Sequence, residues 1–121
     1  MQLRIIFSMF FFFLVSTLSM AEHYTVTVYG KLLDSSGKPI PNKTIYISSP
    51  KGSKYTVSEK TSTFESGEFK WPVYIHDSIP SGVLLISFVN CDNKEVVTEH
   101  RFSKEHKTIE TKLIYCSRSN E

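Results

Sequence analysis

Histidine, cysteine and serine are the side chains of this 121-residue chain with the potential for metal binding or nucleophilic chemistry. The four histidines form neither an HExxH motif nor a close cluster: they are His23, His76, His100 and His106. Glu99-His100 and Glu105-His106 repeat an acid-histidine pair, which could form at most a weak metal or pH-sensitive patch. No serine lies in a GxSxG elbow, and no glycine-rich phosphate loop occurs. We therefore expect no enzyme, no cofactor and no dedicated metal site.

The amino-terminal segment has the pattern of a cleavable secretory signal. Residues 1–4 carry one positive charge, residues 5–18 are apolar apart from three hydroxyl residues, and Ser19-Met20-Ala21 places small residues where signal peptidase reads. The apolar run is shorter than the roughly 18 clean residues of a spanning helix. We predict a signal peptide at residues 1–21 and cleavage before Glu22. The mature domain, residues 22–121, is expected to be secreted, extracellular and without a membrane span.

The two cysteines of the mature domain, Cys91 and Cys116, are expected to form a disulfide because export leads to an oxidising compartment. Predicted strands at 83–89 and 107–116 are separated by one strand, so they run in the same direction and place both cysteines at one end. The alternatives are two free thiols or a bond to another chain. Oxidation would remove both residues as catalytic nucleophiles.

Asn42 belongs to the sequon Asn42-Lys43-Thr44, which follows a proline-rich turn. In an exported protein a sequon at an exposed turn predicts N-glycosylation of the asparagine. The alternative interpretation is that Asn42 serves only the turn conformation.

The charge of the mature domain argues against nucleic acid as a partner. The 14 basic residues less Arg4, against 12 acidic residues, give a net charge of +1. The lysines are scattered along the chain and do not form the stripe that phosphate binding requires.

Hydrophobic side chains alternate with polar ones through almost the whole mature domain, as in half-buried β-strands. We therefore predict an all-β fold, a seven-stranded antiparallel β-sandwich of the immunoglobulin or transthyretin kind. The predicted strands are 24–33, 43–49, 54–60, 69–75, 83–89, 95–102 and 107–116.

Four features of individual strands refine this fold. Pro72 predicts an edge position or a bulge for its strand. The nearly continuous apolar run 83–89 predicts a central strand covered on both faces, and the last two strands are expected to complete a meander. Trp71 and Tyr46 are interpreted as packing residues. Trp71 precedes both cysteines, whereas the tryptophan of true immunoglobulin domains lies between them.

Two stretches resemble macroglobulin domains of the alpha-2-macroglobulin family. The stretch 34–48, DSSGKPIPNKTIYIS, resembles the opening hairpin of such a domain. The stretch 101–119, RFSKEHKTIETKLIYCSRS, is similar to the last strand of the macroglobulin domain that precedes the bait-region domain. The resemblance implies a secreted macroglobulin-like sandwich related to endopeptidase inhibitors. A bait segment and the thioester sequence GCGEQ are absent, so the resemblance does not imply protease inhibition.

The function expected from these features is that of a non-enzymatic module that binds an extracellular protein, either a protease or a receptor, through a sheet face or a loop end. The alternative is a transthyretin-like carrier of a small apolar ligand. A hydrolase of the transthyretin-related type is excluded because Lys31 stands where that family needs a histidine.

Overall fold

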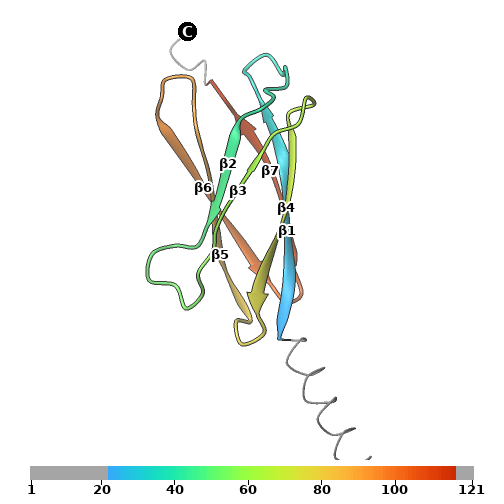
Figure 1. Ribbon diagram of the computed structural model, residues 1–121, viewed down its shortest axis with the longest axis vertical. Helices are drawn as coiled ribbons and strands as arrows, with labels where there is room; N and C mark the ends of the chain where they lie inside the picture. Colours follow the sequence, from blue (N-terminus) through green and yellow to red (C-terminus); the bar gives the residue numbers. More distant parts are fainter. Residues whose placement is uncertain (1–21, 117–121) are drawn as a thin grey trace, which may run out of the picture.

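The computed structural model describes residues 22–116, which form seven β-strands (Figure 1). The predicted signal peptide and residues 117–121 lie outside the described residues. Within residues 22–116 there is no helix of the length and apolarity needed to cross a membrane. The strands are β1 (His23–Leu33), β2 (Thr44–Ser48), β3 (Ser58–Ser62), β4 (Glu68–His76), β5 (Ser81–Val89), β6 (Glu95–Ser103) and β7 (Thr108–Ile114).

The strands are arranged in two sheets that face each other as a β-sandwich, which confirms the predicted fold class (Figure 1). The three-stranded sheet has the order β4-β1-β7 and the four-stranded sheet has the order β3-β2-β5-β6. Every pairing is antiparallel except that between β1 and β7, which is parallel. The first sheet is therefore mixed.

The expected meander of the last strands is wrong. After β6 the chain crosses to the other sheet, where β7 pairs with β1 in the register Val28↔Ile109 and Leu32↔Leu113. Ile109 and Leu113 point into the core beside the buried side chains of Val28 and Leu32. The crossing adds these two apolar side chains to the three-stranded sheet, which would otherwise consist of a single pair of strands.

The core lies between the sheets and follows the alternation of the sequence. Val26, Val28 and Leu32 of β1 and Ile45 and Ile47 of β2 are all fully buried, as the period-two pattern predicts. Because the strands are buried on one face only, a shift of one residue in register would turn these apolar side chains toward the solvent.

Pro72 lies in β4, an edge strand, as predicted. Trp71 on the same strand is half-buried and packs against the core. Its indole Nε1–H donates a hydrogen bond to Glu59 Oε1 at 3.4 Å, which connects β4 with β3 of the other sheet.

The third strand starts later than predicted, at Ser58, and Tyr55 and Val57 precede it. The Tyr55 hydroxyl accepts the N–H of Val83 and donates to the carbonyl of Val83, both at 2.7 Å. β2 is short and pairs with β5 only at residues 85–87. At Val83 the two bonds of Tyr55 take the place of hydrogen bonds to a neighbouring strand. The Tyr55 hydroxyl therefore satisfies the backbone groups of Val83 that a neighbouring strand would otherwise pair with.

The fifth strand is an interior strand of its sheet, as predicted, but the prediction that both of its faces are covered is wrong for the part of the chain that the structure describes. Leu84, Ile86 and Phe88 are buried in the core. Val89, on the opposite face, has 45% of its surface exposed.

Candidate interaction surface

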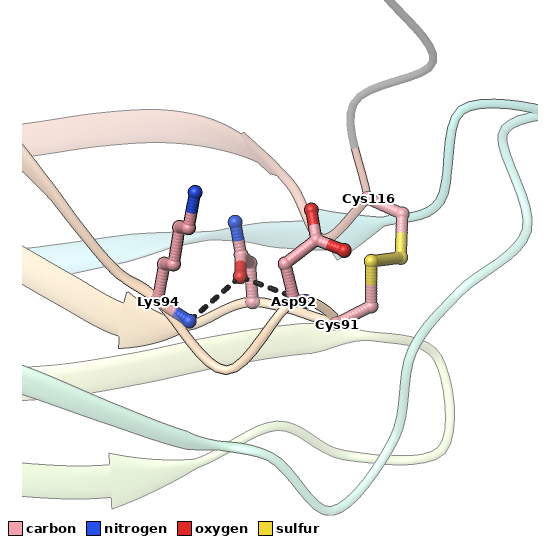
Figure 2. Close-up of a disulfide and its surroundings, with 5 residues drawn as sticks. Cys91, Asp92, Lys94 and Cys116 are labelled. Carbon is pink, nitrogen blue, oxygen red and sulfur yellow. Dashed lines mark hydrogen bonds between the residues drawn. A yellow bond between two sulfur atoms is a disulfide. The ribbon is translucent and has the colours of Figure 1, made fainter. Parts of the chain in front are cut away.

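The predicted disulfide between Cys91 and Cys116 is present, with the two Cα atoms 5.5 Å apart. Figure 2 shows Cys91 in the turn that follows β5 and Cys116 beyond the end of β7. The side-chain oxygen of Asn90 accepts the backbone N–H groups of Asp92 at 2.9 Å and Lys94 at 3.0 Å. This Asx-type turn holds Cys91 in place, and the disulfide fastens the two sheets to each other at one end.

Asn42 lies in an exposed loop immediately before β2, in a left-handed conformation with φ of 58°. Its backbone N–H donates to the carbonyl of Thr63 at 3.0 Å. Asparagine tolerates this conformation better than most residues, so the turn interpretation has a structural basis. The exposure of the residue is also compatible with a glycan, and N-glycosylation stays a prediction.

The repeated acid-histidine pairs do not form one patch. Glu99 is exposed on the outer face of β6, whereas His100 points between the sheets and is half-buried. The Thr98 hydroxyl donates to the carbonyl of Ile86 at 3.2 Å, so its oxygen can accept the Nε2–H of His100 at 2.9 Å. Burial lowers the pKa of His100 from its ordinary value. His106 lies apart, exposed in the turn between β6 and β7.

Two histidines that are far apart in the sequence lie opposite each other: His23 at the start of β1 and His76 at the end of β4. The Asp77 N–H donates to the carbonyl of Glu22 at 2.7 Å, which makes 22 and 77 a hydrogen-bonded pair of the ladder. His23 and His76 are therefore a non-hydrogen-bonded pair, the kind in which side chains approach most closely. Their ring centroids are 5.4 Å apart.

This histidine pair is not apparent from the sequence, because it forms only through the pairing of β1 with β4. Knowledge that the first and fourth strands pair would have revealed it. As the side chains stand, no group of three or more His, Cys, Asp or Glu residues in the described range is arranged to hold a metal ion.

Exposed and half-buried apolar side chains of the four-stranded sheet lie together on its outer face. Tyr46 of β2, Ser87 of β5 and Val97 of β6 are cross-strand neighbours, and Val83, Leu85 and Val89 alternate with inward residues along β5. We define the outer patch by Tyr46, Val83, Leu85, Val89 and Val97. Tyr46, Val89 and Val97 are 43%, 45% and 48% exposed. Tyr46, which was interpreted as a packing residue, lies on this outer face and not in the core between the sheets.

Charged residues border the outer patch on both sides. Lys60 of β3 is the cross-strand neighbour of Tyr46 on one side. Along β6, Glu95, Glu99 and Arg101 pair with Val89, Leu85 and Val83 respectively. An apolar centre with a charged rim is the arrangement found in protein interfaces.

Within residues 22–116, no strand pairs with β6 on the side away from β5. The turn bond from the Asn90 N–H to the Lys94 carbonyl fixes which pairs of the β5–β6 hairpin are hydrogen-bonded. By alternation, Val97, Glu99 and Arg101 direct their N–H and C=O groups to the free edge. The outer patch is therefore continuous with a strand edge that can pair with another chain.

A shallow depression adjoins the outer patch near Asn42, bordered by Tyr46, Val89 and Tyr115. A second depression lies on the other sheet, beside Tyr29 and Phe64. Both are open to solvent, in contrast to the enclosed site that a carrier of an apolar ligand requires. The carrier interpretation gains no support from either.

Comparison with known proteins bears on the fold alone. No family model matches the chain, and no curated protein matches it. It resembles a variant of the major pilin subunit of Bacillus cereus with 14% identity and a TM-score of 0.53, covering 76% of this chain and 30% of the pilin chain. The same pilin in a second structure gives 15% identity, a TM-score of 0.52, and coverage of 74% and 29%. A 9R-lipoxygenase from Cyanothece PCC8801 aligns at 18% identity over 74% of this chain and 16% of its own, with a TM-score of 0.40.

The pilin structures thus define the class as an immunoglobulin-like β-sandwich, and this chain spans less than a third of their length. The resemblance to macroglobulin domains stays a prediction.

Proposed function

We propose that this chain is an exported, non-enzymatic module that binds an extracellular protein through the outer patch. The observation that carries the proposal is the composition of β5. Its inward residues fill the core, and three of its outward residues, Val83, Leu85 and Val89, are apolar as well, with the polar Ser87 between the last two. A strand that needs only one buried face usually has polar residues on the other.

The rim defines the chemistry of the partner. On the β6 side, Glu95 and Glu99 call for basic groups and Arg101 calls for an acidic group. Lys60 on the β3 side calls for a second acidic group, and the centre calls for an apolar strip. We propose an extracellular protein with this surface. The macroglobulin resemblance suggests a protease or a receptor.

Export and glycosylation belong to the same proposal. Secretion of the full chain from a eukaryotic cell, followed by mass spectrometry of the amino terminus, should find Glu22 as the first residue. Asn42→Gln should remove a mass that an endoglycosidase also removes. A secreted product that retains residues 1–21, or an Asn42 variant of unchanged glycan mass, would contradict these two parts.

Binding can be tested with two tyrosines on opposite faces. Tyr46 lies in the outer patch, and Tyr74 lies on the outer face of the other sheet with 65% of its surface exposed. Chemical crosslinking of the secreted protein in extracellular fluid should recover a specific protein. Tyr46→Ser and Val97→Lys should abolish its recovery, and the matched control Tyr74→Ser should leave it unchanged.

The crosslinking experiment is repeated with the enzymatically deglycosylated protein, because a glycan on Asn42 would lie beside Tyr46 and Val89 of the outer patch. Recovery that survives both patch variants, or that depends on Tyr74 instead, refutes the outer patch as the binding surface.

A further inference from the structure

We propose that Glu22, His23 and His76 form a surface site for a divalent transition metal, Zn²⁺ or Cu²⁺, where β1 begins. The two imidazole rings face each other across the β1–β4 ladder with centroids 5.4 Å apart. The Glu22 carboxylate Oε2 lies 3.9 Å from His76 Nε2. This inference does not depend on the proposed protein partner.

The donor set is suited to these ions. Imidazole nitrogen and carboxylate oxygen are both common ligands of Zn²⁺, and imidazole also suits Cu²⁺. With Zn–N bonds of about 2.0–2.1 Å, two nitrogens on one tetrahedral ion lie roughly 3.3 Å apart. The His23 ring, which is perpendicular to that of His76, must turn to reach that separation. His23 is exposed and the Glu22 side chain is 55% exposed, so both can turn toward His76 with little steric resistance.

A hydrogen-bond partner for the second nitrogen of His76 is already in place. Nδ1 lies 2.7 Å from the Ser78 hydroxyl oxygen and accepts the Ser78 backbone N–H at 3.1 Å. Nε2 is therefore the nitrogen directed at Glu22. When a metal replaces the proton on Nε2, the neutral ring carries its proton on Nδ1. The bond that Nδ1 accepts from the Ser78 backbone N–H is then given up, and the Ser78 hydroxyl oxygen becomes the acceptor of the Nδ1–H. Such contacts orient metal-binding histidines.

The turn that carries Ser78 is held against β1. The Tyr24 hydroxyl donates to the carbonyl of Ile79 at 2.6 Å, and the Asp77 carboxylate pairs with the Lys104 ammonium at 3.6 Å. Figure 1 shows this turn, between β4 and β5, at the same end of the sandwich as the start of β1. Because His76 is on the anchored side, Glu22 and His23 are the ligands that must turn toward it.

A bound metal ion would link the start of β1 to the end of β4. Chain ends fray unless they are tied down, and the backbone bond from Asp77 to Glu22 lies at the end of the β1–β4 ladder, beyond the His23–His76 pair. An ion shared by β1 and β4 would hold the first residues of β1 in the sheet. Binding should thus raise the thermal stability of the domain.

The test uses the chain secreted by a eukaryotic cell, with its amino terminus defined by mass spectrometry, titrated with ZnCl₂ in a calorimeter. We expect one ion per chain. His23→Ala and His76→Ala should each weaken binding roughly tenfold or more. The matched control, His106→Ala, removes an exposed turn histidine elsewhere and should leave the affinity unchanged.

A second measurement separates a ligand role from a structural one. Saturating ZnCl₂ should raise the Tm of the parent chain and of His106→Ala, and it should leave the Tm of His76→Ala unchanged. Circular dichroism without metal verifies that each variant is folded. The proposal is overturned if the parent chain binds no Zn²⁺, or if His23→Ala and His76→Ala bind it as tightly as the parent.

Discussion

Removal of the disulfide should lower the free energy of unfolding of this domain by about 3.5 kcal/mol. The bond joins Cys91 to Cys116 across a sequence separation of 25 residues. In the chain-entropy description, a loop of that length removes about 12 cal/mol/K from the unfolded ensemble, which gives the stated value at 25 °C. For a domain of this size, the loss corresponds to a decrease in Tm of roughly 15–25 °C.

The assay is urea unfolding followed by the fluorescence of Trp71, with the parent chain compared with the double variant Cys91→Ala/Cys116→Ala. The backbone bonds from Cys91 to Tyr115 and from Tyr115 to Leu33 do not need the thiols and should persist. The parent chain in reductant is the control and should unfold at the urea concentration of the double variant. A loss below about 1 kcal/mol would refute the reasoning, because the unfolded chain would then gain little conformational freedom when the bond is removed.

Three further variants test individual contacts by the same urea assay. Gly30→Ala should lower the free energy of unfolding by roughly 2 kcal/mol or more, because an added Cβ would overlap the Thr111 carbonyl oxygen of the adjacent strand. An unchanged urea midpoint would contradict this close approach. Tyr55→Phe should lower the free energy of unfolding by about 1–3 kcal/mol, because it leaves the N–H and C=O of Val83 unpaired. An unchanged free energy of unfolding would mean that water replaces the hydroxyl. Burial lowers the pKa of His100, so the unfolded chain takes up a proton at higher pH than the folded one, and stability should fall as the pH drops below about 6.5. His100→Gln should flatten this slope, and an equal slope in the variant would assign it to other groups.

The faces of the strands could be predicted from the sequence because alternation is a local property. Ile45 and Ile47 are buried as expected, and Pro72 marks an edge. The partners of the strands could not be predicted in the same way. Nothing in the alternation of residues 107–116 distinguishes a return to β6 from a parallel pairing with β1, since both would bury Ile109 and Leu113.

The disulfide was predicted correctly even though the meander was not, and the reason is geometric. The prediction required only that β5 and β7 run in the same direction, so that their ends meet at one end of the sandwich. This holds whether β7 pairs in the same sheet or in the opposite one. The crossover changes what the bond does: with β7 in the three-stranded sheet, Cys91–Cys116 joins two sheets.

The sequence alone did not decide whether the outward residues of the run 83–89 are covered or exposed. An apolar run such as 83–89 has the same composition whether its second face is covered within the chain or by another molecule. The structure resolves the ambiguity for the described residues, where Val89 is left exposed.

The contacts that fasten the two ends of the sandwich do not involve the outer patch, so the proposed binding can be tested separately from folding. The disulfide joins the sheets at one end, and at the other end the Tyr24 hydroxyl ties β1 to the turn after β4. The core between them is filled by inward residues, and neither fastening uses Tyr46 or Val97. Polar substitutions in the outer patch should therefore leave the unfolding free energy within about 0.5 kcal/mol of the parent value while they abolish binding, since surface changes of this kind seldom cost more.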